Sequence, residues 1–469
     1  MHKPAQTCPI VHNYPKASAP QLRVSVSPRL RVPSAHHRPR INRVHYEEIA
    51  ATSGEETIMH RIAILALTFA ASAPAGTLQL LHAFGIHSDQ DGNDLYAGVI
   101  LDSSGNVYGV AATGGAHGDG VVYELSRANA WTETALYDFK GHGTHDATQD
   151  GANPNATLMA DSAGNLYGAT VNGGLTSRKC KTGCGTVFML TPAAGRWQET
   201  VLYRFTGGAD GAFPYTGVTL DSAGNLYGTT NSGGTANAGT VYRLTPGSNG
   251  WQETVLYAFQ GHSDGATPFA TPILDPGGNI YGTTNRGGPL GLGIVYMLAP
   301  QPDGSFTEHV LHDFKGGGDG ANPLAGLIFD RLGNLYGTTS YGGTANCGTV
   351  FKLIPDPSGG WKEGILYSFL GPTVYDGQNP NELTFDAHGN LYGTTSGGGS
   401  VNAGTIFEMT RNPAGGWQET VLYSFPGDNQ GAIPNAGVVL DSLGRLYGTT
   451  LWGGPEGFTI GGVVFQFTP

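Results

Sequence analysis

The chain has 469 residues, of which 75 are glycine and only 13% are charged, and its net charge at pH 7 is −12. An acidic chain that is poor in lysine and arginine lacks the cations that bind phosphate, which argues against nucleic acid and anionic membrane surfaces as partners. The glycines fall at fixed offsets between runs rich in Val, Leu, Tyr, Phe and Thr, so they indicate turns rather than disorder. The sequence lacks long helical patterns, which favours an all-β fold.

The N-terminal region carries a candidate export signal. Met59-His-Arg is followed by the apolar run Ile62–Ala70 and by an Ala-x-Ala pattern at Ala73–Ala75. A positive start, a short apolar run and a small-residue cleavage site together predict a signal peptide over residues 59–75. The apolar run is too short to span a bilayer, so we expect no membrane span in the mature chain.

A signal peptide should stand at the start of a chain, and this one begins at residue 59. We therefore expect Met59 to be the true start and residues 1–58 to be a mis-annotated leader. A disordered basic leader is the alternative. In either case the predicted mature, secreted domain is 76–469.

Residues 76–469 contain one repeat of about 56 residues in seven copies. Each copy has a tyrosine, an aspartate six residues before it and a glycine pair that starts six residues after it. A repeat of this length without a helix is typical of a propeller blade. The tyrosines are Tyr108, Tyr167, Tyr227, Tyr281, Tyr336, Tyr392 and Tyr447, and the aspartates are Asp102, Asp161, Asp221, Asp275, Asp330, Asp386 and Asp441.

The third copy shows the four strands expected in each blade. A tight turn with Gly224 joins the first two strands, and an 11-residue connection leads from the fourth strand to the next copy. Such a connection suits a chain that crosses from the outer edge of one blade to the inner strand of the next. The predicted strands of this copy cover residues 216–221, 226–230, 239–246 and 251–259.

The two ends of the repeat array predict how the ring closes. The array opens with a lone fourth-type strand at Thr77–Phe84 and ends with a lone third-type strand at Gly461–Pro469. The last copy therefore lacks its own fourth strand, and we expect the N-terminal strand to complete it. The predicted fold is an all-β, seven-bladed β-propeller with four-stranded blades and no exposed sheet edge at the closure.

The combined pattern DxxGNLYGTT…GG…GTVFxLTP…GxWxETVLYSFxG…DGxxPxAG resembles the Gloeo_Verruco (GloVer) tandem repeat of bacterial extracellular proteins. The resemblance covers nearly all of residues 76–469 and implies an exported protein, often one with a C-terminal sorting signal. The sequence ends at Pro469 inside a strand pattern without a hydrophobic tail, which favours a released protein. The DxxGN-LY core is also similar to NHL and gluconolactonase-like propellers, some of which are enzymes, but that is an analogy of fold alone.

Acidic residues recur in the connections between successive blades, and in six copies an aspartate precedes a glycine. These carboxylates should lie on one face around the channel mouth, where they could bind a cation or the hydroxyl groups of a sugar. The alternative is that each makes an Asx-type turn and binds the amides of its own loop. The six residues are Asp91, Asp150, Asp210, Asp264, Asp319 and Asp376, with Gln430 at the seventh position.

Three features break the symmetry of the repeat. Glu382 stands where other copies have glycine, so its carboxylate is either a channel group or a solvated charge at the rim. The second copy has two inserted loops, at 141–150 and 176–184, and long loops on a rigid scaffold often carry binding specificity. His142, His145 and Asp146 in the first loop are a weak signal for a metal, and we predict no metal site there.

The four cysteines are Cys8, Cys180, Cys184 and Cys347. In an exported chain we expect a disulfide between Cys180 and Cys184 that closes the inserted loop. This prediction leaves Cys347 unpaired. A zinc site is not predicted, because no second Cys/His pair lies nearby in the sequence.

The leading hypothesis is a secreted, monomeric module that binds extracellular carbohydrate or protein through one rim of the ring. No catalytic set is evident and no cofactor is predicted; calcium is the ion that the acidic rim would suit. One alternative is an enzyme of the gluconolactonase or lyase type, with Glu382 as its acid/base. Another is a structural component of the cell envelope, which should self-associate and bind no soluble ligand.

Overall fold

The structure is a computed structural model that describes residues 76–85, 91–141, 150–454 and 461–469. The predicted leader and signal peptide lie outside the described residues. So do His142, His145 and Asp146, the weak metal candidates of the first inserted loop.

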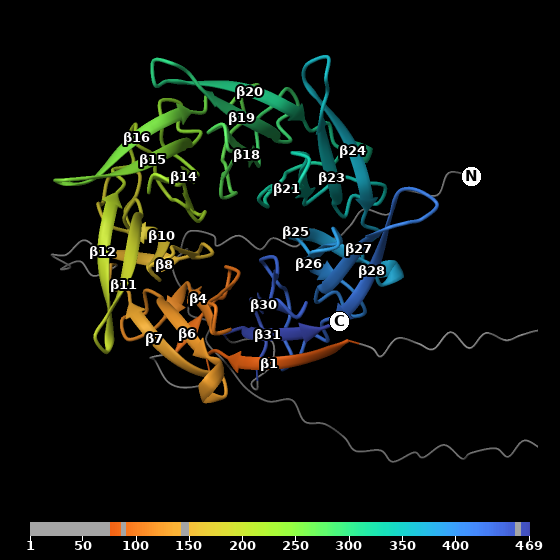
Figure 1. The fold of residues 1–469 in the computed structure, drawn as a ribbon, viewed down its shortest axis with the longest axis horizontal. Helices are drawn as coiled ribbons and strands as arrows, with labels where there is room; N and C mark the ends of the chain where they lie inside the picture. Colours follow the sequence, from red (N-terminus) through yellow and green to blue (C-terminus); the bar gives the residue numbers. More distant parts are fainter. Residues whose placement is uncertain (1–75, 86–90, 142–149, 455–460) are drawn as a thin grey trace, which may run out of the picture. The chain divides into compact units, whose positions relative to one another are not determined.

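Seven antiparallel sheets stand around a ring, one for each copy of the repeat (Figure 1). The strands of each blade are given from the inner to the outer edge. Blade 1 consists of β3 (Ile100–Leu101), β4 (Val107–Ala111), β6 (Val121–Ser126) and β7 (Thr132–Asp138). Blade 2 consists of β8 (Gly151–Pro154) with β9 (Met159–Ala160), β10 (Leu166–Gly173), β11 (Thr186–Ala193) and β12 (Arg196–Arg204), and blade 3 of β13 (Thr219–Leu220), β14 (Leu226–Thr230), β15 (Thr240–Gly247) and β16 (Gly250–Ala258).

Blades 4 to 6 follow the same order from the inner to the outer strand. Blade 4 consists of β17 (Ile273–Leu274), β18 (Ile280–Thr284), β19 (Ile294–Pro300) and β20 (Phe306–Asp313). Blade 5 consists of β21 (Ile328–Phe329), β22 (Leu335–Thr339), β23 (Thr349–Pro355) and β24 (Trp361–Ser368). Blade 6 consists of β25 (Gly377–Phe385), β26 (Leu391–Gly398), β27 (Thr405–Arg411) and β28 (Trp417–Ser424). Short elements in the connections are β2 (Gly92–Asn93), which pairs with β5 (Thr113–Gly114), and the 3₁₀ turns η2 (Arg127–Asn129), η3 (Gly317–Asp319) and η4 (Pro372–Val374).

Blade 7 combines the two ends of the described ring. Its strands β29 (Val439–Leu440), β30 (Leu446–Thr450) and β31 (Val463–Thr468) are completed by β1 (Thr77–Ala83), which pairs antiparallel with β31. The register runs from Thr77 opposite Thr468 to Ala83 opposite Val463. The predicted seven-bladed propeller, and its closure by the N-terminal strand, are confirmed.

In blades 1, 3, 4, 5 and 7 the inner strand is only two residues long, shorter than the sequence pattern predicts, whereas β25 of blade 6 has nine residues. In blade 3 only Thr219 and Leu220 pair with β14, although the pattern predicts a strand from residue 216. The first half of this segment lies against the neighbouring blade instead: a Cβ atom added to Gly217 would lie 2.7 Å from the carbonyl oxygen of Thr157. A glycine is therefore required at this close approach to the neighbouring blade.

The repeated aspartate organises the turn between the first two strands of each blade. Asp221 accepts hydrogen bonds from the backbone N–H groups of Ala223 and Asn225, from the Asn225 amide and from the Tyr227 hydroxyl, at 2.8–3.1 Å. Burial alone would raise the pKa of Asp221, but these donors outweigh burial and lower it. This turn explains the spacing of Asp, Asn and Tyr in the repeat.

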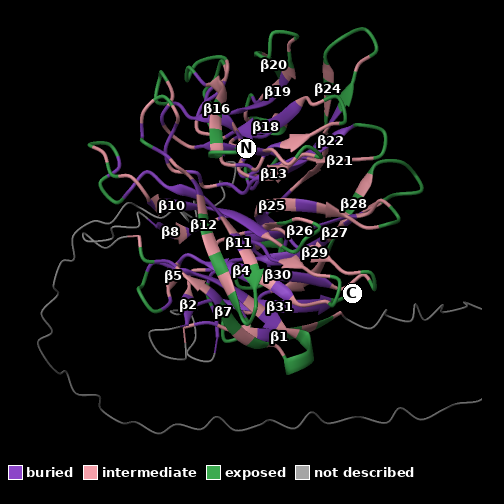
Figure 2. Ribbon diagram, turned by 60° about the vertical axis from the view of Figure 1, so that its left-hand side comes forward, coloured by how far each residue is buried: buried purple, intermediate pink, exposed green. Residues whose placement is uncertain are grey.

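Aromatic side chains join one blade to the next. Phe205, just after β12, is fully buried, and its ring meets that of Tyr242 on β15 edge-on at 5.1 Å. Gly228 on β14 leaves room for that tyrosine, because an added Cβ would overlap the hydroxyl group. Equivalent Phe residues lie at the other junctions, so the buried core follows the ring (Figure 2).

Each connection between blades contains one non-glycine residue whose φ lies between +52° and +61°. Where this residue is asparagine, as at Asn153, Asn322 and Asn379, its side-chain amide donates to a carbonyl of the preceding blade at 2.8–2.9 Å. The other four positions are Asp94, Phe213, Thr267 and Ile433. A left-handed conformation is tolerated by Asn and is strained for a β-branched residue.

We predict that Thr267→Asn stabilises the fold. The Thr267 hydroxyl is buried without a hydrogen-bond partner, and an asparagine there would place its amide toward the carbonyl of Asn231. Relief of strain and the new hydrogen bond should raise the free energy of unfolding by about 1 kcal/mol, measured by chemical denaturation. Asn322→Thr should lower it by a similar amount, and equal stabilities of variants and parent would contradict this account.

Candidate functional site

Two kinds of loop open on the same face of the ring, which we call the loop face. They are the connections from each outer strand to the next inner strand and the loops between the second and third strands of each blade, since strand direction alternates within a blade. The acidic connections, the inserted loop at 176–184 and η4 all belong to this face.

The predicted aspartates of the loop face bind their own loops. The Asp264 carboxylate accepts the Tyr257 hydroxyl at 3.1 Å and the backbone N–H of Gln260 at 2.7 Å. Asp150, Asp210 and Asp376 make the same pair of bonds, and at the seventh position the Gln430 side-chain oxygen accepts the Tyr423 hydroxyl at 2.9 Å. Asp91 accepts the N–H groups of Gly85 and Gly92. This is the loop-closing arrangement given above as the alternative to ligand binding.

A glutamate from the next blade lies near each of these aspartates. Glu253 on β16, for example, is close enough to Asp210 to feel its charge. Burial first, and Asp210 second, raise the pKa of Glu253 to about 7. We call each such set of three side chains a blade junction. In the regular case the tyrosine comes from one outer strand, the aspartate from the connection that follows it, and the glutamate from the outer strand of the next blade. The glutamates are Glu133, Glu199, Glu253, Glu308, Glu363 and Glu419, and one side-chain oxygen of each is buried without a hydrogen-bond partner.

The seventh junction shows that the two acids occur together. There Gln430 replaces the aspartate, and Leu78 on β1 stands where the other outer strands have glutamate. Leu78 packs in the apolar cluster that also contains Phe467 and Tyr423. The sequence analysis missed these glutamates, although the recurring Trp-x-Glu pattern and this paired loss were visible signals.

Two junctions have histidine in place of tyrosine. His312 at the end of β20 has its Nε2 atom 3.1 Å from Oδ1 of Asp319, and Glu363 lies on the neighbouring outer strand β24. Burial lowers the pKa of His312, and this outweighs the opposing effect of Asp319. His82, beside Asp91, is the second case, with 3.8 Å between His82 Nε2 and Asp91 Oδ1.

Glu382 belongs to the innermost positions of the ring. It lies on β25, and its carboxylate accepts the backbone N–H of Gly437 from the next blade at 3.4 Å. Burial raises the pKa of Glu382, and the bond from Gly437 offsets only part of this effect. The equivalent residues of the other blades are Gly98, Thr157, Gly217, Thr271, Gly326 and Gly437, so Glu382 is the one acid among the seven.

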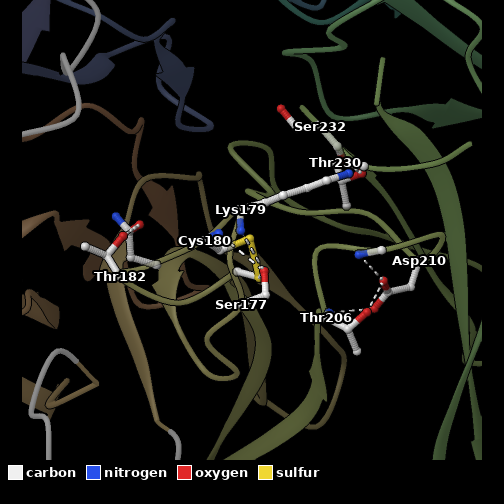
Figure 3. The surroundings of a disulfide bond; sticks show 12 residues. Ser177, Lys179, Cys180, Thr182, Thr206, Asp210, Thr230 and Ser232 are labelled. Carbon is white, nitrogen blue, oxygen red and sulfur yellow. Dashed lines mark hydrogen bonds between the residues drawn. A yellow bond between two sulfur atoms is a disulfide. The ribbon is translucent and has the colours of Figure 1, made fainter. Parts of the chain in front are cut away.

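The inserted loop of blade 2 is closed by a disulfide between Cys180 and Cys184 (Figure 3). Both cysteines are buried, and the sulfur atoms lie against Gly207 of the next connection, where an added Cβ would come within 2.8 Å of both. The Lys179 ammonium reaches the Asn237 side chain at 3.5 Å. The loop is thereby fixed to blade 3.

The expectation of an unpaired Cys347 is wrong, because Cys347 is disulfide-bonded. Its bonding partner lies outside the described residues. Residues 76–469 contain three cysteines, and the pairing of Cys180 with Cys184 left none of them for Cys347.

Blade 6 exposes the largest group of apolar side chains on the loop face. Leu370, Val374, Tyr375 and Val401 are 45%, 56%, 67% and 56% exposed, and they account for four of the eleven exposed large hydrophobic residues in the described chain. The connection at 370–376 is two residues longer than its equivalent in blade 3, and it includes η4. We call these four residues the blade 6 patch.

Together, the ring of seven blades and its closed seam define a β-propeller. Within this class, the chain belongs to the Gloeobacter/Verrucomicrobia repeat family, whose sequence profile matches residues 65–296 and 269–469. The resemblance drawn from the repeat motif is thus confirmed. No curated protein sequence matches the chain.

Solved structures with low sequence identity resemble the chain over 84% of its length. An ancestral GH74 enzyme has 11% identity and a TM-score of 0.52, with 51% of its own chain covered. The extracellular domain of a putative hybrid two-component system from B. thetaiotaomicron has 12% identity and a TM-score of 0.48, with 41% covered. A putative gluconolactonase has 14% identity and a TM-score of 0.38, with 93% covered.

The chain thus spans 51% or less of the GH74 enzyme and the two-component domain. At this level of identity the likeness concerns the fold alone. Among the described residues, no helix is long and apolar enough to cross a membrane.

The raised pKa values at the junctions predict how stability depends on pH. The ordinary pKa of a glutamate is 4.5, whereas burial raises that of Glu253 to about 7 and that of Glu419 to about 8. The folded chain therefore binds more protons than the unfolded chain between about pH 4.5 and 8, and these groups lower the free energy of unfolding as pH rises through that window.

Glu253→Gln should remove one such contribution. We expect the variant to match the parent below about pH 4 and to exceed its free energy of unfolding by about 1 kcal/mol at pH 8.5. The shift of the Glu253 pKa from 4.5 to about 7 corresponds to at most about 3.4 kcal/mol, and solvent screening of the half-buried carboxylate reduces this. Urea denaturation at a series of pH values measures this difference. Gln252→Glu, which adds an acid on the exposed side of β16, is the control and should leave the pH dependence unchanged. Parallel pH profiles for Glu253→Gln and the parent would refute the account.

Proposed function

We propose that this protein is a secreted binding module that recognises extracellular carbohydrate through its loop face, with the blade 6 patch as the contact surface. The observation that carries the proposal is the exposure of Tyr375, Leu370 and Val374 in one connection. The exposed Val401 lies in the loop to which this connection is hydrogen-bonded. An exposed, rigidly held aromatic ring offers a large amphipathic surface at low entropic cost, which suits the apolar face of a sugar ring.

The patch is supported by a rigid scaffold. Asp376 accepts the backbone N–H groups of Leu370 and Gly377 at 2.7 and 2.6 Å and the Tyr367 hydroxyl at 3.0 Å. Its own carbonyl oxygen accepts the N–H of Gly399, which ties the connection to the loop that carries Val401. In this proposal the acidic residues of the loop face hold the binding loops in place rather than contact the ligand.

Secretion is part of the same proposal. Residues 59–75 have the composition of a signal peptide, and the disulfide between Cys180 and Cys184 suits an oxidising compartment. The acidic, lysine-poor composition supports a neutral ligand over nucleic acid or an anionic membrane.

Tyr375→Ala should abolish most of the binding. The test applies the full chain to a panel of immobilised polysaccharides, with and without calcium, and we expect retention on at least one of them. The variant should bind that polysaccharide at least tenfold more weakly, a loss of about 1.4 kcal/mol. Leu332→Ala is the matched control, because Leu332 is 84% exposed in a turn on the opposite face. If the chain instead binds a cell-envelope protein, and Tyr375→Ala abolishes that binding, then the blade 6 patch is the contact surface but its ligand is a protein.

A second candidate function is catalysis at Glu382. The observation that favours it is a buried carboxyl with a raised pKa at the one acidic position of the innermost ring, which is a suitable state for a general acid. The same polysaccharide panel, together with small lactones, should be scored for released products. Product release that Glu382→Gln abolishes while retention persists would establish an enzyme, and no release from any substrate would leave the binding module as the function.

A further inference from the structure

We propose that the junction between blades 4 and 5 binds a divalent transition-metal ion of the zinc class through His312, Asp319 and Glu363. Each side chain offers one ligand atom, and the three atoms lie within 4.8 Å of one another. The residues come from β20, η3 and β24, and both β20 and η3 contact β24. In Figure 1 the outer strands β20 and β24 are neighbours on the ring.

The distances suit a small cation. His312 Nε2 and Asp319 Oδ1 are 3.1 Å apart. Around tetrahedral zinc, with bonds of about 2.0–2.2 Å, neighbouring ligand atoms lie roughly 3.3–3.5 Å apart, so this pair needs only a small separation to admit the ion. A rotation of the Glu363 side chain would bring the third ligand into range, and a water molecule would take the fourth position.

The proposed site also contains an unsatisfied oxygen atom, a feature that Glu363 shares with the five equivalent glutamates. Oε1 of Glu363 is buried and has no hydrogen-bond partner, a costly state for a carboxylate oxygen. The His312 side chain is 12% exposed and the Asp319 side chain 19%, so the trio is shielded from water yet remains reachable by an ion. One nitrogen and two carboxylate oxygens are a common ligand set for zinc.

The other charged groups nearby do not replace an ion. The Lys315 ammonium acts on both His312 and Glu363 as a nearby positive charge, and Asp313 adds a negative charge near His312. No ion pair joins Lys315 to Glu363 among the described residues. The backbone N–H of Lys315 donates to Asp319 at 2.6 Å. The carboxylate of Glu363 thus keeps an open coordination position.

The repeat itself provides the comparison. Where Tyr257 occupies the position of His312, the phenol donates its proton to Asp264 and offers no ligand atom at neutral pH. Those junctions therefore have two candidate ligands. The junction that contains His82, Asp91 and Glu133 has the same three residue types, but His82 Nε2 is 3.8 Å from Asp91 Oδ1. Among the described residues, the ligand atoms of His312, Asp319 and Glu363 are the three that lie within 4.8 Å of one another. The sequence analysis considered metal binding only in the inserted loop at 141–150, because the three residues lie 7 and 44 positions apart along the chain.

The experiment uses the untagged full chain, freed of metal by a chelator, loaded with zinc and dialysed. The metal content of the parent should exceed that of His312→Tyr by one zinc per chain, and zinc should raise the melting temperature of the parent by several degrees more than that of the variant. Cobalt in place of zinc should give a visible absorption band in the parent that His312→Tyr lacks. His312→Tyr installs the residue that the repeat itself uses, so the variant should fold.

Two further variants make the result specific. Glu363→Gln should weaken zinc binding at least tenfold, whereas Tyr257→Phe, which alters the equivalent position of the preceding junction, should leave the metal content unchanged. Equal zinc content in the parent and His312→Tyr would overturn the proposal, and so would the same loss in Tyr257→Phe. Binding of zinc by the parent only above about 100 µM would also overturn it, because a three-ligand protein site should be far tighter.

Discussion

The pairing of β1 with β31 is the contact on which the whole ring depends. Each blade forms its hydrogen-bonded ladder only within itself, so six blades with a complete set of strands would still leave β31 with an open edge. The register from Thr77 to Ala83 closes that edge with a strand from the other end of the repeat array. Because every inner segment packs against the next blade around the channel, closure also fixes the spacing at which the seven junctions form. A displaced β1 would therefore expose Phe84 and loosen the junctions on both sides of blade 7.

Between blades, apolar packing stabilises the ring, whereas the buried acids destabilise it. Phe205 and its equivalents bury their rings in the next blade, which is a favourable term at every junction. The nearby pairs of acids oppose it, since burial and mutual repulsion raise the pKa values of glutamates such as Glu308 and Glu363 to about 7. The seventh junction, with Gln430 and Leu78, shows that the ring can do without such a pair. The aspartates contribute by closing their loops, and at one junction the two acids are part of the proposed ligand set.

Much of the fold could be predicted from the sequence because the repeat tests each inference seven times. The spacing of Asp221, Gly224 and Tyr227 recurs in every copy, and a turn and a second strand follow from it directly. The paired part of the inner strands could not be predicted, because Gly217 packs against a blade that is distant in sequence. The same limit hid the approach of Glu363 to His312. Local sequence patterns predict the strands and turns within a blade, whereas contacts between blades are visible only in the three-dimensional structure.

Symmetry also bears on where a function can arise. In a repeat protein, stability is spread over similar units and their interfaces, so one altered unit endangers only its own neighbours. Blade 6 departs from the pattern twice within a single connection: a longer outer part presents Tyr375, and a shorter inner part places Glu382 at the ring. The junction of blades 5 and 6 keeps the regular set of Tyr367 on β24, Asp376 in the connection and Glu419 on β28. The altered connection therefore rests on a regular junction. A surface that must be both new and rigid is best built in this way, by changing the loop and retaining the junction beneath it.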